Sequence, residues 1–392
     1  MVASSDGVEQ SNAIDPGVFL DPNTHRLWLV YGSYFGFIRQ VELDPKTGKR
    51  LHPDDKPRDL AINCEASDMM YHDGWYYLLA THGSCCRGAD SGYNVRVGRS
   101  RSVNGPFIDN MGVDMIQGGG YQLIGSSGRY IGPGHFGLLD LGEGVQKFSM
   151  HWEADLDRGG ASVLDIRPLL WKDGWPVAGE NMKEGNYQMY SPRTGNSLEL
   201  AVEGVPVGGR FTRGPRPGGG LGGPGANNAP LPAAGVPGAQ APGAGGVGMF
   251  GGTGAPIRDQ QAADVSKNWP TGNIDIRMSN YMAQAQQKWA VTPVDNAGGY
   301  PGSPYFKITI AGTDRALAAT DKAELTVRSS FTGAPEELWR FDQLADGSWR
   351  IMLKDIPNSK QPMVLTVLGS GSVTLEKYDS ASDKQRWLLK TP

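Results

Sequence analysis

The stretch Gly74-Trp75-Tyr76-Tyr77-Leu78-Leu79-Ala80, which follows the turn-like pair His72-Asp73, is apolar, aromatic and short. Runs of this kind between turn signals are typical of buried strands. Further strand patterns, bounded by Gly, Asp and Pro, lie at residues 26–31, 93–98 and 162–167, and no long stretch has a convincing helical period. The sequence therefore predicts an all-β fold: a propeller, a barrel or a sandwich.

Three polar landmarks stand beside these strand patterns. Asp15 lies in Asn-Ala-Ile-Asp-Pro (12–16), Glu65 in Cys-Glu-Ala-Ser (64–67) and His135 in Gly-Pro-Gly-His (132–135). Cleavage of a glycosidic bond needs one protonated and one ionised carboxyl group on either side of the bond. Taken singly, Asp15 is as readily interpreted as the cap of a turn before Pro16, and Glu65 as the partner of a cation such as Arg87. As a set, the landmarks predict a carboxylate site.

The composition permits a carbohydrate protein and disfavours two other classes of partner. The 392 residues carry a formal net charge of −4, too mild to indicate nucleic acid or an anionic membrane as partner. No apolar run approaches the roughly 18–20 residues that span a bilayer. The first residues lack the charged and apolar regions of a signal peptide. The cysteines Cys64, Cys85 and Cys86 predict buried, reduced thiols rather than a disulfide framework.

A low-complexity segment at about residues 205–257 interrupts the second half of the chain. It is rich in Gly, Pro and Ala, and positions 217–257 carry no charged residue. Such a composition cannot bury enough apolar surface to offset chain entropy, so we expect a disordered insertion.

Three tryptophans recur at nearly constant spacing after this segment. Trp289, Trp339 and Trp387 are 50 and 48 residues apart, and each stands in a Gln-x-Trp or Glu-x-Trp triplet. Repeats of this length imply one unit per lobe of a pseudo-threefold fold, with the tryptophans in the core. Residues 179–392 resemble a ricin-type β-trefoil, in which Gln-x-Trp stands once per lobe. Glu337 departs from that pattern.

The first half of the chain resembles the endo-α-1,5-L-arabinanases of glycoside hydrolase family 43. Seven motifs carry the resemblance in the family's order: the three landmark motifs, Gly32-Ser33-Tyr34-Phe35-Gly36, Ser84-Cys85-Cys86-Arg87-Gly88, Val97-Gly98-Arg99-Ser100 and Gln117-Gly118-Gly119-Gly120. The resemblance implies a five-bladed β-propeller over residues 1–178, followed by the β-trefoil-like domain.

The resemblance also implies roles for individual residues. Family members invert the anomeric centre with three carboxylates, and the matching motifs make Glu65 the general acid and Asp15 the carboxylate that tunes its pKa. His135 matches a histidine near the propeller axis, close to a bound ion that is often calcium. The implied substrate-binding residues are Asn12, Ser33, Tyr34, Phe35, Cys86 and Arg87.

One expected part of the family pattern is absent from this sequence. Only eleven residues precede Asn12, so the first blades and the general-base Asp have no counterpart; Asp6 does not match the base motif. We therefore expect an N-terminally truncated propeller. Three interpretations stay open: an impaired arabinan-degrading hydrolase, a non-catalytic carbohydrate-binding remnant, and a split enzyme completed by a second chain. Family resemblance favours arabinan or a related plant cell-wall polysaccharide as ligand, and an extracellular or periplasmic location.

Overall fold

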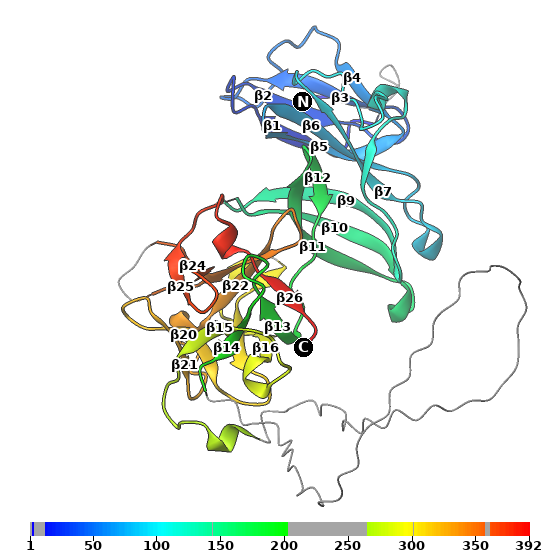
Figure 1. The fold of residues 1–392 in the computed structure, drawn as a ribbon. Helices are drawn as coiled ribbons and strands as arrows, with labels where there is room; N and C mark the ends of the chain where they lie inside the picture. Colours follow the sequence, from blue (N-terminus) through cyan, green and yellow to red (C-terminus); the bar gives the residue numbers. More distant parts are fainter. Residues whose placement is uncertain (1, 4–11, 143, 203–264, 301, 357–360) are drawn as a thin grey trace, which may run out of the picture. The chain divides into compact units, whose positions relative to one another are not determined.

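Three four-stranded antiparallel sheets make up the first part of the computed structural model (Figure 1). The structure describes residues 2–3, 12–142, 144–202, 265–300, 302–356 and 361–392. Asp6 and the segment at 205–257 lie outside these ranges. In each of the three sheets, strands that are consecutive in the chain are hydrogen-bonded neighbours, the arrangement found in a propeller blade. The strands are β1 Gly17–Leu20, β2 Leu27–Tyr31, β3 Phe37–Leu43 and β4 Arg58–Ile62; β5 Cys64–His72, β6 Trp75–His82, β7 Asn94–Ser100 and β8 Tyr121–Ile124; β9 Tyr130–Asp140, β10 Gln146–Asp155, β11 Ala161–Lys172 and β12 Trp175–Ala178.

The apolar stretch of residues 74–80 forms most of strand β6 of the middle sheet, and its position explains why it is continuously apolar rather than alternating. Successive side chains of a strand point to opposite faces, and both faces of this sheet are covered. Leu78 packs into a core shared with the first sheet, around Trp28 and Ile38. Leu79 packs into a second core shared with the third sheet, around Trp152. The prediction of a buried strand here is confirmed.

The second and third sheets share a hydrogen-bonded connection at one backbone oxygen. The Tyr77 hydroxyl and the Arg99 guanidinium both donate to the carbonyl oxygen of Gly174, each at 2.7 Å. Gly174 lies in the turn between β11 and β12. The Arg99 guanidinium also lies 4.4 Å from the ring centroids of Trp75 and Trp175, one from each sheet.

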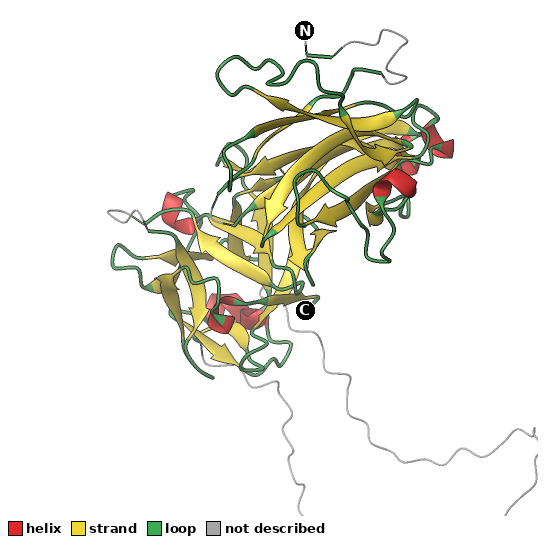
Figure 2. Cartoon of the chain, turned by 90° about the horizontal axis from the view of Figure 1, so that it is seen from above, coloured by secondary structure: helices red, strands yellow, loops and turns green. Residues whose placement is uncertain are grey.

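A larger, twelve-stranded sheet arrangement follows in the chain (Figure 2). Its strands are short, and three of its 3₁₀ turns stand directly before the predicted tryptophans: η5 Ala285–Gln287, η6 Pro335–Glu337 and η7 Asp383–Gln385. The strands of the arrangement, with the separate pair β17–β18, are β13 Gly185–Tyr190, β14 Ser197–Leu200, β15 Ile276–Ser279, β16 Trp289–Pro293, β17 Gly299–Tyr300, β18 Ser303–Pro304, β19 Phe306–Ile310, β20 Ala316–Ala319, β21 Leu325–Arg328, β22 Trp339–Gln343, β23 Trp349–Leu353, β24 Met363–Val367, β25 Val373–Lys377 and β26 Leu388–Lys390.

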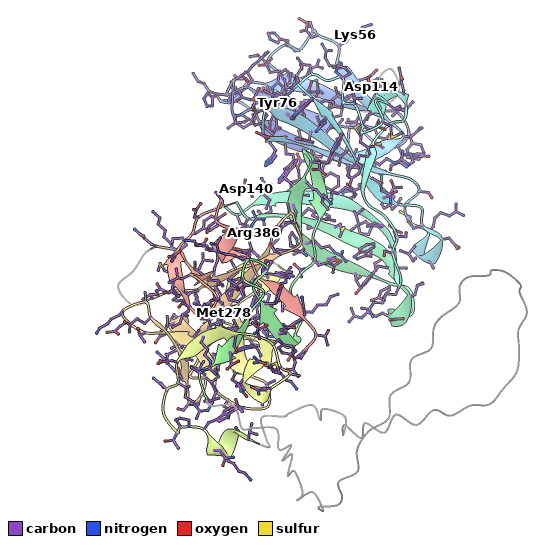
Figure 3. All side chains as sticks on the ribbon, in the orientation of Figure 1. Lys56, Tyr76, Asp114, Asp140, Met278 and Arg386 are labelled. Carbon is purple, nitrogen blue, oxygen red and sulfur yellow. The ribbon has the colours of Figure 1, made fainter. Side chains whose placement is uncertain are left out.

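The three tryptophans occupy equivalent positions in this second core. Trp289, Trp339 and Trp387 are fully buried, in one cluster with Met278 (labelled in Figure 3). Each indole N–H donates to the backbone carbonyl of a leucine: Leu198 at 2.9 Å, Leu317 at 3.0 Å and Leu365 at 2.8 Å. The same indole-to-carbonyl hydrogen bond at three positions indicates a repeated structural unit. The core position predicted for the tryptophans is confirmed.

The residue two places before each tryptophan is buried as well. The partners of Glu337 explain why a glutamate can stand where the other two repeats have glutamine. Gln287 and Gln385 each accept a backbone N–H and donate to a backbone carbonyl. Glu337 accepts the N–H groups of Thr332 and Gly333, and pairs with Arg328 at 2.9 Å. The carboxylate has no proton to donate, so a guanidinium takes the place of the carbonyl acceptor.

The fold is all-β apart from short 3₁₀ turns in the described ranges, as the sequence predicts. The five-bladed propeller, the trefoil and the boundary between residues 178 and 179 remain predictions. None of the helices in the described ranges is a candidate for spanning a bilayer.

Candidate active site

The three landmark residues lie on or beside the first strand of each four-stranded sheet. Asp15 stands just before β1, Glu65 is the second residue of β5 and His135 lies in β9. Strand β1 lies against β5, and β5 lies against β9. The fold therefore brings together side chains that are up to 120 positions apart in the sequence.

Two β-bulges set the direction of the site's side chains. The register between β5 and β6 shifts between Glu65 and Asp68, so that one extra residue follows Glu65. The register between β9 and β10 shifts in the same way beside His135. A bulge bends its strand locally and re-aims a side chain, and bulges are frequent next to active sites.

The backbone at the site adopts the left-handed conformation at four residues other than glycine. Their φ angles are 54° at Asp15, 45° at Ala66, 63° at Cys86 and 47° at His135. Such a conformation costs a non-glycine residue about 1–3 kcal/mol, and residues of this kind gather at functional sites. The landmark motifs thus specify strained turns as well as side chains.

The glycine before His135 is required by close packing. A Cβ atom at Gly134 would lie 2.5 Å from the Tyr93 ring and 2.6 Å from the Thr81 methyl group. The Thr81 hydroxyl also accepts the His135 N–H at 3.0 Å. Gly134 therefore lets β9 approach the second sheet closely enough to hold His135 at the site.

The surroundings of Glu65 raise the pKa of its carboxyl group. Burial raises the pKa of Glu65, the charge of Asp15 raises it further, and His135 opposes this rise. No cation in the described ranges forms an ion pair with its carboxylate, so the interpretation of Glu65 as the partner of Arg87 is wrong. A half-buried, unpaired carboxyl group with a raised pKa suits a general acid.

Asp15 makes long-range contacts rather than capping its own turn. Its Oδ2 accepts the N–H of Ala66 at 3.3 Å, and its Oδ1 lies 3.9 Å from Nε2 of His135. The Asp15 side chain is 17% exposed, whereas that of His135 is 54% exposed. Asp15 is therefore fixed directly beside the residue that follows Glu65.

Sequence analysis missed two residues at this site, Glu153 and His151. The Glu153 carboxylate accepts the N–H of Cys86 at 2.9 Å and lies 2.9 Å from Nε2 of His151. Its charge also contributes to the raised pKa of Glu65. The available signal was the alternation in β10, which places His151 and Glu153 on one face of the strand that pairs with β9.

The remaining predicted site residues fall into two groups. Asn12 and Ser33 are half-buried and buried, and the Ser33 hydroxyl has no partner within the described ranges. Tyr34 and Phe35 are exposed, by 42% and 82%, with their rings edge to face at 6.4 Å. Cys86 and Arg87 are exposed beside Glu153. Exposed aromatic rings are suited to stacking on a sugar.

The prediction of three buried thiols is wrong in part. All three cysteines are free, but only Cys64 is buried, and burial raises its pKa to about 12. Cys86 is exposed because its backbone N–H, rather than its thiol, points inward to Glu153.

The calcium site expected near His135 stays a prediction, because its expected ligands are His135 and water molecules. Ca²⁺ takes six to eight oxygen ligands. Within the described ranges no group of three or more His, Cys, Asp or Glu side chains is arranged to hold a metal ion. His135 offers a nitrogen, with the Asp15 carboxylate beside it. These residues do not form a protein cage for calcium.

Comparison with known proteins agrees with the sequence motifs. Residues 2–176 match the family model described as Glycosyl hydrolases family 43. The "Extracellular endo-alpha-(1->5)-L-arabinanase 1" of Bacillus subtilis is 32% identical over 182 residues, which cover 45% of this chain and 54% of that protein. The "Probable arabinan endo-1,5-alpha-L-arabinosidase D" of Emericella nidulans is 35% identical over 211 residues, 49% of this chain and 55% of that protein.

One similar solved structure is also known. It is an exo-1,5-alpha-L-arabinanase from a bovine ruminal metagenomic library, 34% identical, with a TM-score of 0.42 over 46% of this chain and 60% of that chain. The chain spans about half the length of the curated relatives it matches. Arabinanases of family 43 are thus homologues of residues 2–176.

Proposed function

We propose that residues 1–178 carry a glycoside hydrolase site for α-1,5-linked arabinan, with Glu65 as the general acid. The observation that carries this proposal is the unpaired Glu65 carboxyl group, whose pKa is raised by burial and by Asp15, at the meeting point of three sheets. The relatives' names supply the substrate, because they are arabinan-cleaving enzymes.

In the proposed reaction, Glu65 donates its proton to the glycosidic oxygen as the bond to the anomeric carbon breaks. Asp15 keeps that proton on Glu65 in the resting enzyme through its negative charge. Tyr34 and Phe35 form the exposed wall on which the sugar rings lie. We assign no described residue as the base that activates water for inversion. General-base catalysis of this kind typically contributes about 10²–10⁴-fold to the rate.

Release of reducing sugar from debranched arabinan tests the proposal. The full chain is compared with Glu65→Gln, with Asp15→Asn/Glu65→Gln and with Glu184→Gln, which replaces an exposed glutamate that lies far along the chain. We expect release to fall by about 10²–10⁴-fold in the first two variants and to be unchanged in the third. Equal release from Glu65→Gln and the parent would rule out Glu65 as the acid. Oligosaccharide products indicate endo action and arabinose alone indicates exo action.

A non-catalytic arabinan-binding role is the second candidate, favoured by the 82% exposure of Phe35. Retention on an arabinan affinity gel by a folded chain that releases no sugar supports it. Loss of retention in Phe35→Ala, with the melting temperature unchanged, locates the binding surface.

Three further expectations remain proposals. A second chain that completes the propeller would double the mass measured by light scattering. Calcium bound near His135 would raise the melting temperature and would do so less in His135→Gln. An extracellular location accords with the names of two relatives from Bacillus subtilis and Cellvibrio japonicus.

A further inference from the structure

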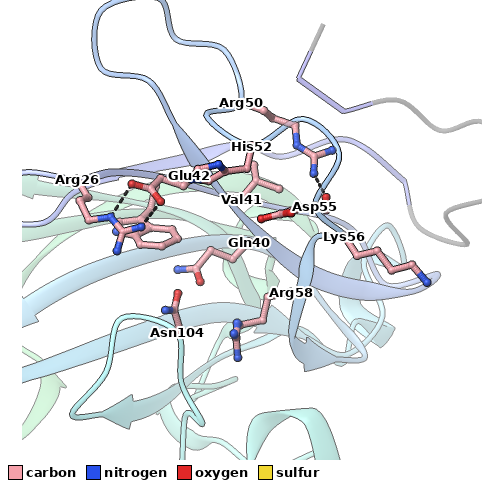
Figure 4. A pocket seen from close by; sticks show the side chains of 11 residues that line it. Arg26, Gln40, Val41, Glu42, Arg50, His52, Asp55, Lys56, Arg58 and Asn104 are labelled. Atoms are coloured by element: carbon pink, nitrogen blue, oxygen red, sulfur yellow. Dashed lines mark hydrogen bonds and ion pairs between the residues drawn. The ribbon is translucent and has the colours of Figure 1, made fainter.

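A polar cavity lies on the first sheet, and neither Glu65, Asp15 nor His135 lines it. Its volume is about 310 Å³, and it is bordered by β2, β3, the segment between β3 and β4, and the loop of Asn104 (Figure 4). It shares no lining residue with the candidate active site. Pockets of this size are large enough for a small ligand.

Positive charge predominates in the lining of this cavity. Four cations, Arg26, Arg50, Lys56 and Arg58, face two carboxylates, Glu42 and Asp55. The guanidinium of Arg26 is bound by Glu42, and that of Arg50 donates to the backbone oxygen of Asp55.

Two of the four cations have no side-chain partner in the described ranges. Lys56 (labelled in Figure 3) and Arg58 form no ion pair or hydrogen bond through their side chains within the described ranges. Both side chains are exposed. Two free cations beside a pocket attract an anionic group.

The floor of the cavity carries two buried polar atoms with no partner in the described ranges. Gln40 is 3% exposed, and its Nε2 is fixed by the Val103 carbonyl at 3.0 Å and by the Met69 sulfur at 3.5 Å, but its Oε1 has no donor. Trp28 is 6% exposed, and its indole N–H has no acceptor. Figure 4 shows the Gln40 and Asn104 side chains facing the same space as Arg58.

An unpaired buried polar group is unfavourable, so a partner for these two atoms would be stabilising. Gln40 Oε1 accepts only, and the Trp28 indole donates only. The hydroxyl groups of a sugar do both. A fully ionised anion without hydroxyls has no proton for Gln40, and a neutral sugar leaves Lys56 and Arg58 unused.

We propose that this cavity binds an acidic sugar, with the carboxylate of a hexuronate held by Lys56 and Arg58 and its hydroxyl groups by Gln40 and Trp28. The site is independent of the hydrolytic proposal, because neither its charge nor its floor involves Asp15, Glu65 or His135. In this proposal the cavity binds an acidic polysaccharide, and the protein chain that carries it also carries the proposed hydrolytic site.

Calorimetric titration of the full chain at about 50 mM ionic strength tests the ligand class. The probes are D-galacturonate, D-galactose, acetate and sulfate. We expect D-galacturonate to bind at least about tenfold more tightly than D-galactose or acetate, and to weaken as salt is added. Equal affinity for D-galactose would overturn the role of the cations. Sulfate binding as tight as that of D-galacturonate would overturn the role of the floor.

Substitutions then test the location. Arg58→Gln and Lys56→Gln remove one exposed charge each, and we expect each to weaken D-galacturonate binding about tenfold without lowering the melting temperature. Lys49→Gln, an exposed lysine outside the lining, is the matched control. Unchanged binding in both pocket variants would overturn the proposal.

An NMR measurement reports on the floor directly. The indole N–H resonance of Trp28, identified by its loss in Trp28→Phe, is expected to move on addition of D-galacturonate. An unmoved resonance at saturation would also overturn the proposed site.

Discussion

The Oδ1 of Asp15 lies 3.9 Å from Nε2 of His135, and both residues act on the proton of Glu65, in opposite directions. The negative charge of Asp15 stabilises the protonated form of Glu65, and the positive charge of His135 stabilises the ionised form. Substituting one or the other of these two residues should therefore shift the pKa of Glu65 in opposite directions.

Replacing Asp15 by Asn removes the charge that raises the pKa of Glu65. We expect the Glu65 carboxyl group to titrate at lower pH in this variant, followed by its NMR carboxyl resonance. Because a general acid works only when protonated, the alkaline limb of any hydrolytic activity moves to lower pH as well. A carboxyl titration that stays in place would show that burial alone raises the pKa.

Replacing His135 by Gln is expected to have the opposite sign. Loss of the His135 side chain removes an interaction that lowers the pKa of Glu65, so the Glu65 titration and the alkaline limb move to higher pH. The same carboxyl resonance measures this. His25→Gln, which changes an exposed histidine with no part in the site, serves as the control.

Replacing Glu153 by Gln is expected to destabilise the segment that carries Cys86 and Arg87. The bond from the Cys86 N–H to a carboxylate is charge-assisted, and an amide oxygen accepts it more weakly. We expect a loss of about 1–2 kcal/mol in the free energy of unfolding, measured by denaturant titration. Faster amide exchange at Cys86 would accompany it, and unaltered exchange would contradict the role given to Glu153.

Asp68 makes stability depend on pH. Burial raises the pKa of Asp68 to about 6, above the value of about 4 in an unfolded chain. The folded protein therefore binds more protons than the unfolded chain between these values, and this contribution to stability is lost as pH rises from about 4 to 6.

Replacing Asp68 by Asn keeps an acceptor for the Met69 N–H and removes this pH-dependent loss of stability. We expect Asp68→Asn to be more stable than the parent by at most about 3 kcal/mol at pH 7, and equal to it at pH 4. Equal stability of the two proteins at pH 7 would contradict the raised pKa.

The three repeated indole bonds predict three similar losses of stability. Trp289→Phe, Trp339→Phe and Trp387→Phe each remove a buried N–H donor from a leucine carbonyl, at a cost of about 1–3 kcal/mol. Chemical denaturation of the three variants measures this. Trp349→Phe, at a half-buried position, is the control, with a smaller expected loss. One variant as stable as the parent would break the equivalence of the repeats.

The sequence predicts the members of the site better than their local geometry. Short motifs identify Asp15, Glu65 and His135 because chemistry restricts those positions to one residue type. Sequence periodicity cannot reveal the bulges beside Glu65 and His135, because a bulge depends on the register between two strands. Glu153 was missed for a related reason. The alternation in β10 places Glu153 on one face with His151, but its bond to Cys86, 67 positions away, depends on the tertiary fold.

The two hydrogen bonds accepted by the carbonyl oxygen of Gly174 also affect how the first part of the chain unfolds locally in solution. The donors to it, Tyr77 and Arg99, belong to the second sheet, whereas the turn that carries it ends the third. Detaching the β11–β12 hairpin therefore breaks bonds to both sheets at once. We expect amide protons of that hairpin to exchange with deuterium in the same cooperative opening as those of β6 and β7, rather than by fraying from the end of their own sheet.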